Sequence, residues 1–105
     1  MFTLLCQRIR ELTLQAAELV DNNQIQQCLA ILVERQSLLE QLKHQFLSSG
    51  VNPDVSNSFT SLLHWLQQQD AINEAKVIKL RDQSKQTGIA QAKIKKALHQ
   101  YKNLT

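Results

Sequence analysis

Only two segments of this 105-residue chain gather residues that interrupt helices, Asp21 to Asn23 and Ser48 to Pro53. Elsewhere Leu, Ile and Val recur at three- and four-residue spacing among Gln, Lys and Glu, which is the spacing of one face of an α-helix. Two glycines and one proline are too few for the turns of a β-rich domain. The sequence therefore predicts an all-α fold, a three-helix antiparallel bundle with a long third helix.

The length of the chain predicts a single domain spanning residues 1–105. The apolar periodicity gives the bounds of each expected helix within it. The second helix is apolar nearly all round, which is typical of a helix buried against two neighbours. Asp21, Asn22 and Asn23 are expected to end the first helix, to tolerate the tight turn and to cap the second helix. Gly50 and Pro53 are expected to end that helix. The three expected helices cover about 2–20, 24–47 and 55–86, and a basic C-terminal helix is expected over about 89–102.

The third helix is longer than the helices that support it. If it pairs antiparallel with the second helix about Val51, Leu80 comes level with the start of that helix, and no partner remains beyond it. Either the chain bends near Thr87 and Gly88 and a fourth helix folds back, or the end projects and pairs with another subunit. A break at Gly88 is favoured because glycine costs about 1 kcal/mol in a helix interior.

The segment after Gly88 is basic and has an apolar stripe of its own, formed by Ile94, Leu98 and Tyr101. Residues 71–105 hold eight Lys/Arg and two Asp/Glu, whereas residues 1–70 hold four Lys/Arg and seven Asp/Glu. Such a segment is either a solvated helix face or a basic tail for an acidic partner. It also supports an alternative function, a basic coiled-coil dimer that is regulatory or associated with nucleic acid.

The sequence contains no residue set that predicts catalysis, a cofactor or a metal. His44, His64 and His99 lie in three different segments without partner residues at metal-ligand spacing. In an antiparallel hairpin Cys6 and Cys28 lie some ~15 Å apart along the axis, too far for a disulfide, so both are expected to be small buried thiols. We expect a binding protein rather than an enzyme, with no catalytic residue, metal or cofactor.

The location expected from the sequence is cytoplasmic. No run of apolar residues is long enough to span a membrane. The charges near the N-terminus follow the apolar residues, the reverse of a secretory signal.

The third helix carries the candidate partner-binding residues. Asp70 and Asn73 interrupt its apolar seam, where a polar residue either fixes register or oligomer state or serves as a polar contact in a partner groove. Trp65 and Ile72 form a strip on the flank of that seam. On a helical wheel drawn through a continuous helix, this strip aligns with Lys76, Ile94 and Tyr101. The strip either contacts the first helix or stays open for a partner. The full candidate surface is Trp65, Asp70, Ile72, Asn73, Lys76, Val77 and Leu80.

Two stretches of the chain resemble the FliT-type bacterial flagellar export chaperones. Ile25 to Leu42 is similar to the second helix of that family, with Arg35 followed by the paired Leu38 and Leu39. Ala92 to Tyr101 is similar to the basic ending that precedes a tyrosine in the family. The asparagine turn between the first two helices and the order of elements also agree, so the resemblance covers most of the chain.

The resemblance implies a cytosolic, helical, non-enzymatic chaperone. Such a chaperone binds the C-terminal helical region of the flagellar filament-cap protein. It then delivers that protein to the export gate and the export ATPase complex. Some family members also bind the master flagellar regulator, and a C-terminal helix can mask the binding surface. On this resemblance Ile94, Leu98 and Tyr101 are expected to belong to a regulatory tail that lies over a client groove.

Overall fold

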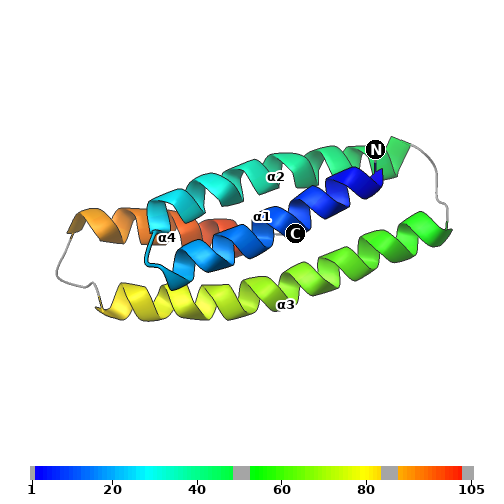
Figure 1. Ribbon diagram of the computed structural model, residues 1–105. Helices are drawn as coiled ribbons and strands as arrows, with labels where there is room; N and C mark the ends of the chain where they lie inside the picture. The colour runs from blue at the N-terminus through cyan, green and yellow to red at the C-terminus, as the bar shows by residue number, and fades with distance from the viewer. Residues whose placement is uncertain (1, 49–52, 84–87, 103–105) are drawn as a thin grey trace.

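The computed structural model describes residues 2–48, 53–83 and 88–102, and these residues form helices without any strand. Helix α1 spans Phe2–Asp21, α2 spans Ile25–Ser48, α3 spans Pro53–Gln83 and α4 spans Gly88–Lys102 (Figure 1). The prediction of an all-α fold with a break near Gly88 is confirmed. Residues 84–86 and Thr87 of the expected third helix and bend, and Gly50 of the expected loop, lie outside the described residues.

The turn between α1 and α2 is built on Asn23, whose φ of 60° places it in the left-handed region. Asparagine enters this region more readily than most residues. The Gln24 amide donates to the Leu19 carbonyl at 2.8 Å and the Asn23 amide donates to the Val20 carbonyl at 3.0 Å, the paired bonds of a Schellman motif. The asparagines therefore end α1, and the expectation that they cap α2 is wrong, because the Gln24 carbonyl accepts the first bond of α2.

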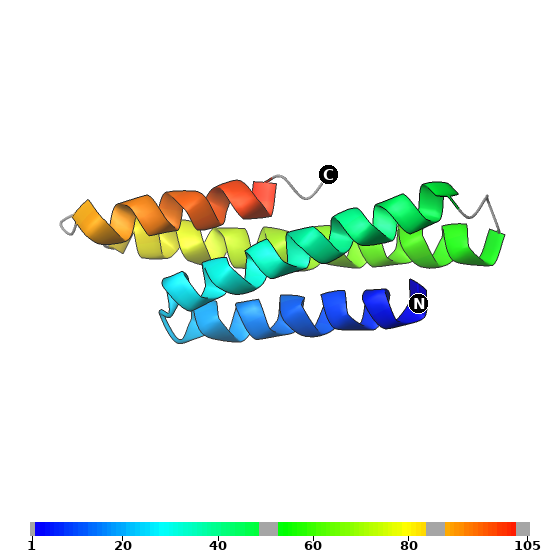
Figure 2. The ribbon, with the colours of Figure 1, turned by 90° about the horizontal axis from the view of Figure 1, so that it is seen from above.

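The helices lie side by side in an elongated molecule of 51 × 19 × 19 Å. Helices α1 and α4 each pack on both α2 and α3, and Figure 2 shows them on opposite sides of that pair. At about 1.5 Å per residue, α3 runs nearly the whole length of the molecule, whereas the 15 residues of α4 reach only about half of it. One end of the molecule therefore has four helices and the other has three.

Two hydrophobic clusters fill these two ends. The four-helix end holds Ala16, Val20, Cys28, Leu32, Val77, Ile94, Ala97, Leu98 and Tyr101. The three-helix end holds Cys6, Ile9, Leu39, Leu42, Leu62 and Leu66, with Trp65 and Phe59 packed against them. Phe46 stacks on Phe59 with ring centroids 4.8 Å apart, which joins α2 to α3 at this end. Both cysteines are buried free thiols, as the spacing argument predicts.

Candidate functional site

Helix α4 lies over a groove between α2 and α3. Its inward residues recur at the three- and four-residue spacing of one helical face. All of them are buried: Ile94, Ala97, Leu98 and Tyr101. They pack against Cys28 and Leu32 of α2 and Val77 of α3. Without α4, these apolar side chains would face water, so the groove needs a helix to cover it.

The contact between Tyr101 and Cys28 closes the inner end of this groove. The Tyr101 hydroxyl and the Cys28 Sγ lie 3.5 Å apart in a hydrogen bond in which either group can donate. Burial raises the pKa of the Tyr101 hydroxyl, and the neighbouring Cys28 acts in the same direction. Burial also raises the pKa of the Cys28 thiol, which the hydrogen bond to Tyr101 only partly offsets. Both groups therefore hold their protons while α4 is docked.

A polar layer separates the two hydrophobic clusters. The Arg35 guanidinium donates from both terminal nitrogens to the two oxygens of Asp70, each at 2.8 Å. The same guanidinium donates to Thr13 Oγ1 at 3.4 Å, and the Thr13 hydroxyl donates to the Ile9 carbonyl at 2.8 Å. These side chains are buried, so the ion pair connects α2 to α3 inside the molecule.

Burial of this polar layer disfavours the charged form of Asp70 and leaves two hydrogen-bond donors without partners. Burial raises the pKa of the Asp70 carboxyl, although the hydrogen bonds from Arg35 act in the opposite direction. Arg35 Nε and Asn73 Nδ2 are buried without a hydrogen-bond partner. An unsatisfied buried donor costs about 1–3 kcal/mol. These two donors therefore make an unfavourable contribution to the stability of the layer.

The structure divides the seven candidate partner-binding residues between the interior and the surface. Asp70, Asn73 and Val77 are buried, and Leu80 is partly buried against the four-helix cluster. Their presence on the seam of α3 agrees with the sequence pattern, and in the docked state Asp70, Asn73 and Val77 have almost no exposed surface.

The remaining candidates lie outside the core but make different contacts. Trp65 is half-buried, with the Arg10 guanidinium of α1 6.0 Å from its ring centre. Ile72 is 53% exposed. Lys76 donates to Asp21 at 2.8 Å on the surface. The strip therefore contacts α1 at Trp65 and is open at Ile72, and its expected alignment with Ile94 and Tyr101 is wrong because α4 runs back.

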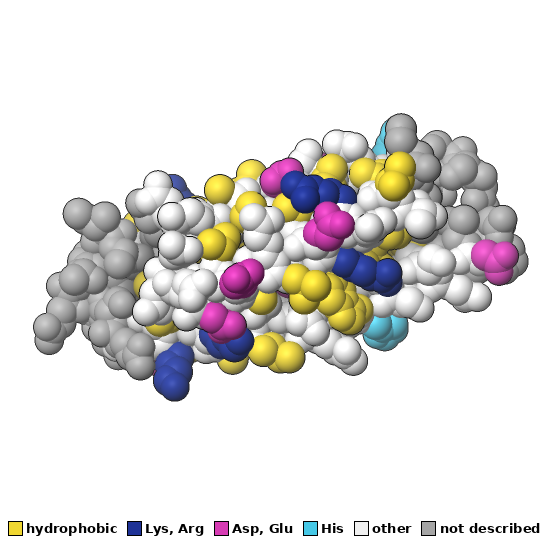
Figure 3. All heavy atoms as spheres, viewed as in Figure 1, with side chains coloured by type: hydrophobic (Ala, Val, Ile, Leu, Met, Phe, Trp, Pro, Cys, Tyr) yellow, Lys and Arg dark blue, Asp and Glu magenta, His cyan; other side chains and the backbone are white. Residues whose placement is uncertain are grey.

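The face of the molecule that is toward the viewer in Figure 1 is chemically mixed. Figure 3 shows hydrophobic, acidic and basic side chains interspersed over it rather than gathered by kind. Arg8 contacts Glu11 and Glu34 there at 3.5 and 3.4 Å. No single chemistry on this face specifies a partner.

Sequence reasoning missed Arg35 as a partner of Asp70. The signal was present, because Arg35 takes the place of an apolar residue in the 4-3-4-3 series Cys28, Leu32, Arg35, Leu39 and Leu42. Asp70 interrupts the corresponding seam of α3. Opposite charges on two facing seams predict an ion pair.

Searches of protein-family models, curated proteins and solved structures give no match to this chain. Among the residues that the structure describes, no His, Cys, Asp and Glu side chains gather in threes that could hold a metal ion. None of the described helices combines the length and apolar character of a membrane span.

Proposed function

We propose that this protein is a non-enzymatic, cytoplasmic chaperone of the flagellar export type, which binds an amphipathic helix of the filament-cap protein in the groove now covered by α4. The observation that carries this proposal is the mode of packing of α4. An amphipathic helix laid into an apolar groove is a common mode of peptide recognition, and α4 supplies such a helix from within the chain. A client helix with a similar apolar stripe would compete with it.

In this proposal α4 is a regulatory mask. The apparent affinity for a client is reduced by the fraction of molecules in which α4 is displaced. Ile94, Leu98 and Tyr101 hold the mask down, and Val77 and Leu80 of α3 belong to the surface beneath it. Transfer of the client to the export gate and the export ATPase complex, and binding to the master flagellar regulator, are further expectations from the family resemblance.

The test is binding of the C-terminal helical region of the filament-cap protein, measured by calorimetry on three forms of the chain. The intact chain is compared with one that ends at Thr87 and with Ala97→Glu, which places a carboxylate at a fully buried position of α4. Both changes displace the mask, and if α4 is undocked in about a tenth of intact molecules, client affinity rises on the order of tenfold.

Ala92→Glu is the matched control, because Ala92 is exposed on the same helix and the same substitution should leave client affinity unchanged. Trp65, the only tryptophan, reports by its fluorescence whether the three-helix end stays folded in each variant. Absence of a complex with all three folded forms would remove the proposal.

The alternative, a basic coiled-coil dimer that is regulatory or associated with nucleic acid, requires an apolar seam that is free after Gly88. Ile94, Leu98 and Tyr101 are buried within their own chain. No observation on the described residues favours this alternative or a homodimer formed through α4.

A further inference from the structure

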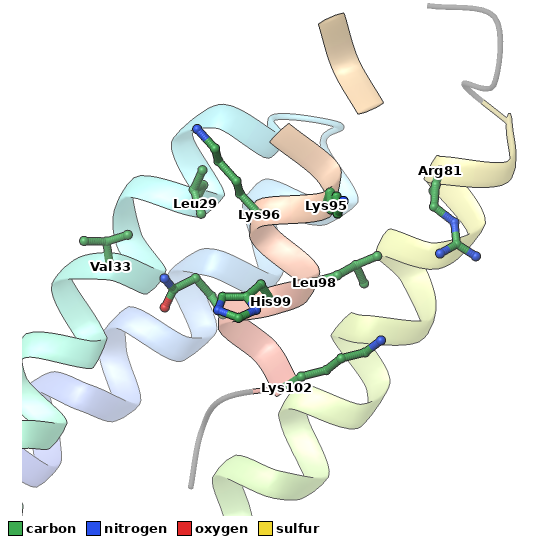
Figure 4. A pocket seen from close by; sticks show the side chains of 9 residues that line it. Leu29, Val33, Arg81, Lys95, Lys96, Leu98, His99 and Lys102 are labelled. Atoms are coloured by element: carbon green, nitrogen blue, oxygen red, sulfur yellow. The ribbon is translucent and has the colours of Figure 1, made fainter. Parts of the chain in front are cut away.

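A second groove, separate from the one beneath α4, lies along the outer side of that helix. Its volume is about 620 Å³, within the range of about 300–1,000 Å³ that is usual for binding pockets. Its apolar residues are Leu29 and Val33 of α2 and Leu98 of α4. Figure 4 shows Leu29 and Val33 on the α2 side of α4, toward which Lys96 extends, and Leu98 pointing toward α3, where Arg81 and Lys102 lie. Val33 is 51% exposed and lies one helical turn from Leu29 on α2, so the groove carries apolar surface that a partner could cover.

The ionisable residues that line this groove are all basic. They are Arg81 of α3 and Lys95, Lys96, His99 and Lys102 of α4. Lys102 lies 3.8 Å from Glu74, a long distance for an ion pair, and Arg81 lies 3.6 Å from its neighbour Asp82. No ion pair is found for Lys95 or Lys96 within the described part of the chain. The groove therefore combines positive charge with apolar side chains.

We propose that this groove binds an acidic amphipathic helix of a partner protein. An apolar stripe on that helix would cover Val33 and Leu29, and carboxylates beside the stripe would face the lysines of α4. Opposite charge at the rim of an interface sets orientation and accelerates association, and the apolar contact supplies the burial. The two features together match a helix-in-groove mode of recognition.

Other partners fit this surface less well. The groove has no Phe, Tyr or Trp in its lining, and the imidazole of His99 is the one aromatic ring among its lining residues. It therefore lacks the series of rings on which successive nucleic-acid bases stack. A membrane-surface helix needs an outward apolar face, whereas the apolar residues Ile94, Ala97 and Tyr101 face the core. A peptide helix uses both the apolar side chains and the lysines.

This groove exists only while α4 is docked, because α4 forms one wall. A helix bound here would stabilise the docked state, and by linkage it would weaken any ligand that binds where α4 lies. This consequence rests on the proposed function, but binding of the acidic helix itself does not. The two proposals therefore fail separately.

The test uses the full chain and a fluorescent 15-residue peptide of Leu, Glu and Ala, with Leu at three- and four-residue spacing and Glu on both sides of the stripe. Fluorescence anisotropy at low and at physiological salt measures its affinity. We expect Lys95→Glu/Lys96→Glu to weaken binding at least about tenfold and Val33→Ser to weaken it about fivefold. A peptide with Lys in place of Glu should bind this double variant better than it binds the natural chain.

Matched controls come from the opposite end of α2. Lys43→Glu changes an exposed lysine and Leu47→Ser changes an exposed apolar residue, and neither lines the groove, so both should bind the acidic peptide as the natural chain does. Circular dichroism checks that every variant keeps its helices.

Several results would overturn the proposal. One is equal binding of a peptide with the same composition but scrambled order, because charge alone would then explain the affinity. Another is tighter binding of duplex DNA or of vesicles containing anionic lipid, in the same salt, that Lys95→Glu/Lys96→Glu abolishes. A third is self-association of the chain that this double variant and Val33→Ser both remove, because a second copy would then be the occupant.

Discussion

Arg35 of α2 and Asp70 of α3 form a two-pronged ion pair inside the molecule, with both bonds at 2.8 Å and Arg35 only 1% exposed. In each helix that contributes to the layer, the polar residue falls between apolar residues of the two clusters. Arg35 lies between Leu32 and Leu39, and Asp70 lies between Leu66 and Val77. A shift of α2 against α3 by one helical turn would bury both charges without partners, so the pair specifies the register.

Removal of one partner of this pair is expected to destabilise the fold strongly. Asp70→Asn leaves the Arg35 charge buried without its counter-ion, which typically costs about 3–5 kcal/mol. The measurement is the free energy of unfolding from urea titration. Asp21→Asn is the matched control, because Asp21 pairs with Lys76 on the surface, where such a pair contributes less than about 1 kcal/mol.

Replacement of the whole pair separates its role in stability from its role in register. Arg35→Met combined with Asp70→Leu should recover most of the stability that Asp70→Asn loses, because well-packed apolar residues can replace a buried pair at little cost. If the combined variant were as unstable as Asp70→Asn, the charge–charge contact would not be the source of the loss.

The stability of the three-helix end should depend on the close packing of its hydrophobic cluster. Leu66 is fully buried in that cluster, whereas Leu14 of α1 is 55% exposed. We expect Leu66→Ala to cost about 2–5 kcal/mol through lost contacts and an unfilled cavity and Leu14→Ala to cost less than about 0.5 kcal/mol. Urea titration followed by Trp65 fluorescence measures both, and similar losses would contradict the placement of α1.

Alkaline pH should loosen the four-helix end. An exposed tyrosine loses its proton near about pH 10, whereas burial raises the pKa of Tyr101 above its usual value. Below the usual pKa both the folded and the unfolded state hold the proton, so stability does not change. Between the usual and the raised pKa only the unfolded state has lost it, and stability falls as the pH rises.

Tyr101 is the only tyrosine of the chain, so tyrosinate absorbance follows this group alone. We expect the intact chain to form tyrosinate at higher pH than Ala97→Glu, in which α4 is displaced and Tyr101 meets water. Tyr101→Phe should remove the part of the alkaline loss of stability that comes from this group. If tyrosinate formed in the intact chain at the same pH as in a free tyrosine, α4 would not be docked as described.

The thiol of Cys28 provides a separate measure of α4 opening. Cys28 is fully buried and contacts Tyr101, so a thiol reagent reaches it only when α4 moves away. In a Cys6→Ser background, we expect Ala97→Glu to raise the labelling rate at least about tenfold and Ala92→Glu to leave it unchanged. Equal rates in all three chains would mean that Cys28 is reached by another route.

Much of the fold could be predicted because helical periodicity is local. The spacing of apolar residues located all four helices to within three residues of their observed bounds. The lack of a partner beyond Leu80, together with Gly88, favoured the break before α4. Asp70 and Asn73 were placed on the seam of α3 for the same reason. A wheel drawn through an unbroken third helix failed for Ile94 and Tyr101, because the reversal of the chain changes which residues they meet.

The candidate sites were less accessible to this reasoning because they depend on how helices distant in sequence come together. Lys95 and Lys96 are recognisable as basic residues, but their position beside Val33 requires the packing of α4 on α2. The pairing of Arg35 with Asp70 could have been predicted by comparing the two seams. The side-by-side placement of Tyr101 and Cys28, 73 positions apart, could not.

The short reach of α4 has a consequence for how the molecule opens. Tyr101 is the last buried residue in the described part of α4, and the charges of Arg35 and Asp70 act on the pKa of its hydroxyl. The described part of α4 therefore ends beside the polar layer. Detachment of α4 disturbs one hydrophobic cluster and leaves the other intact, which is the condition for a sub-global unfolding unit that exchanges its amides independently. The partially unfolded species closest to the native state should then be a three-helix molecule that can close again without refolding the rest of the chain.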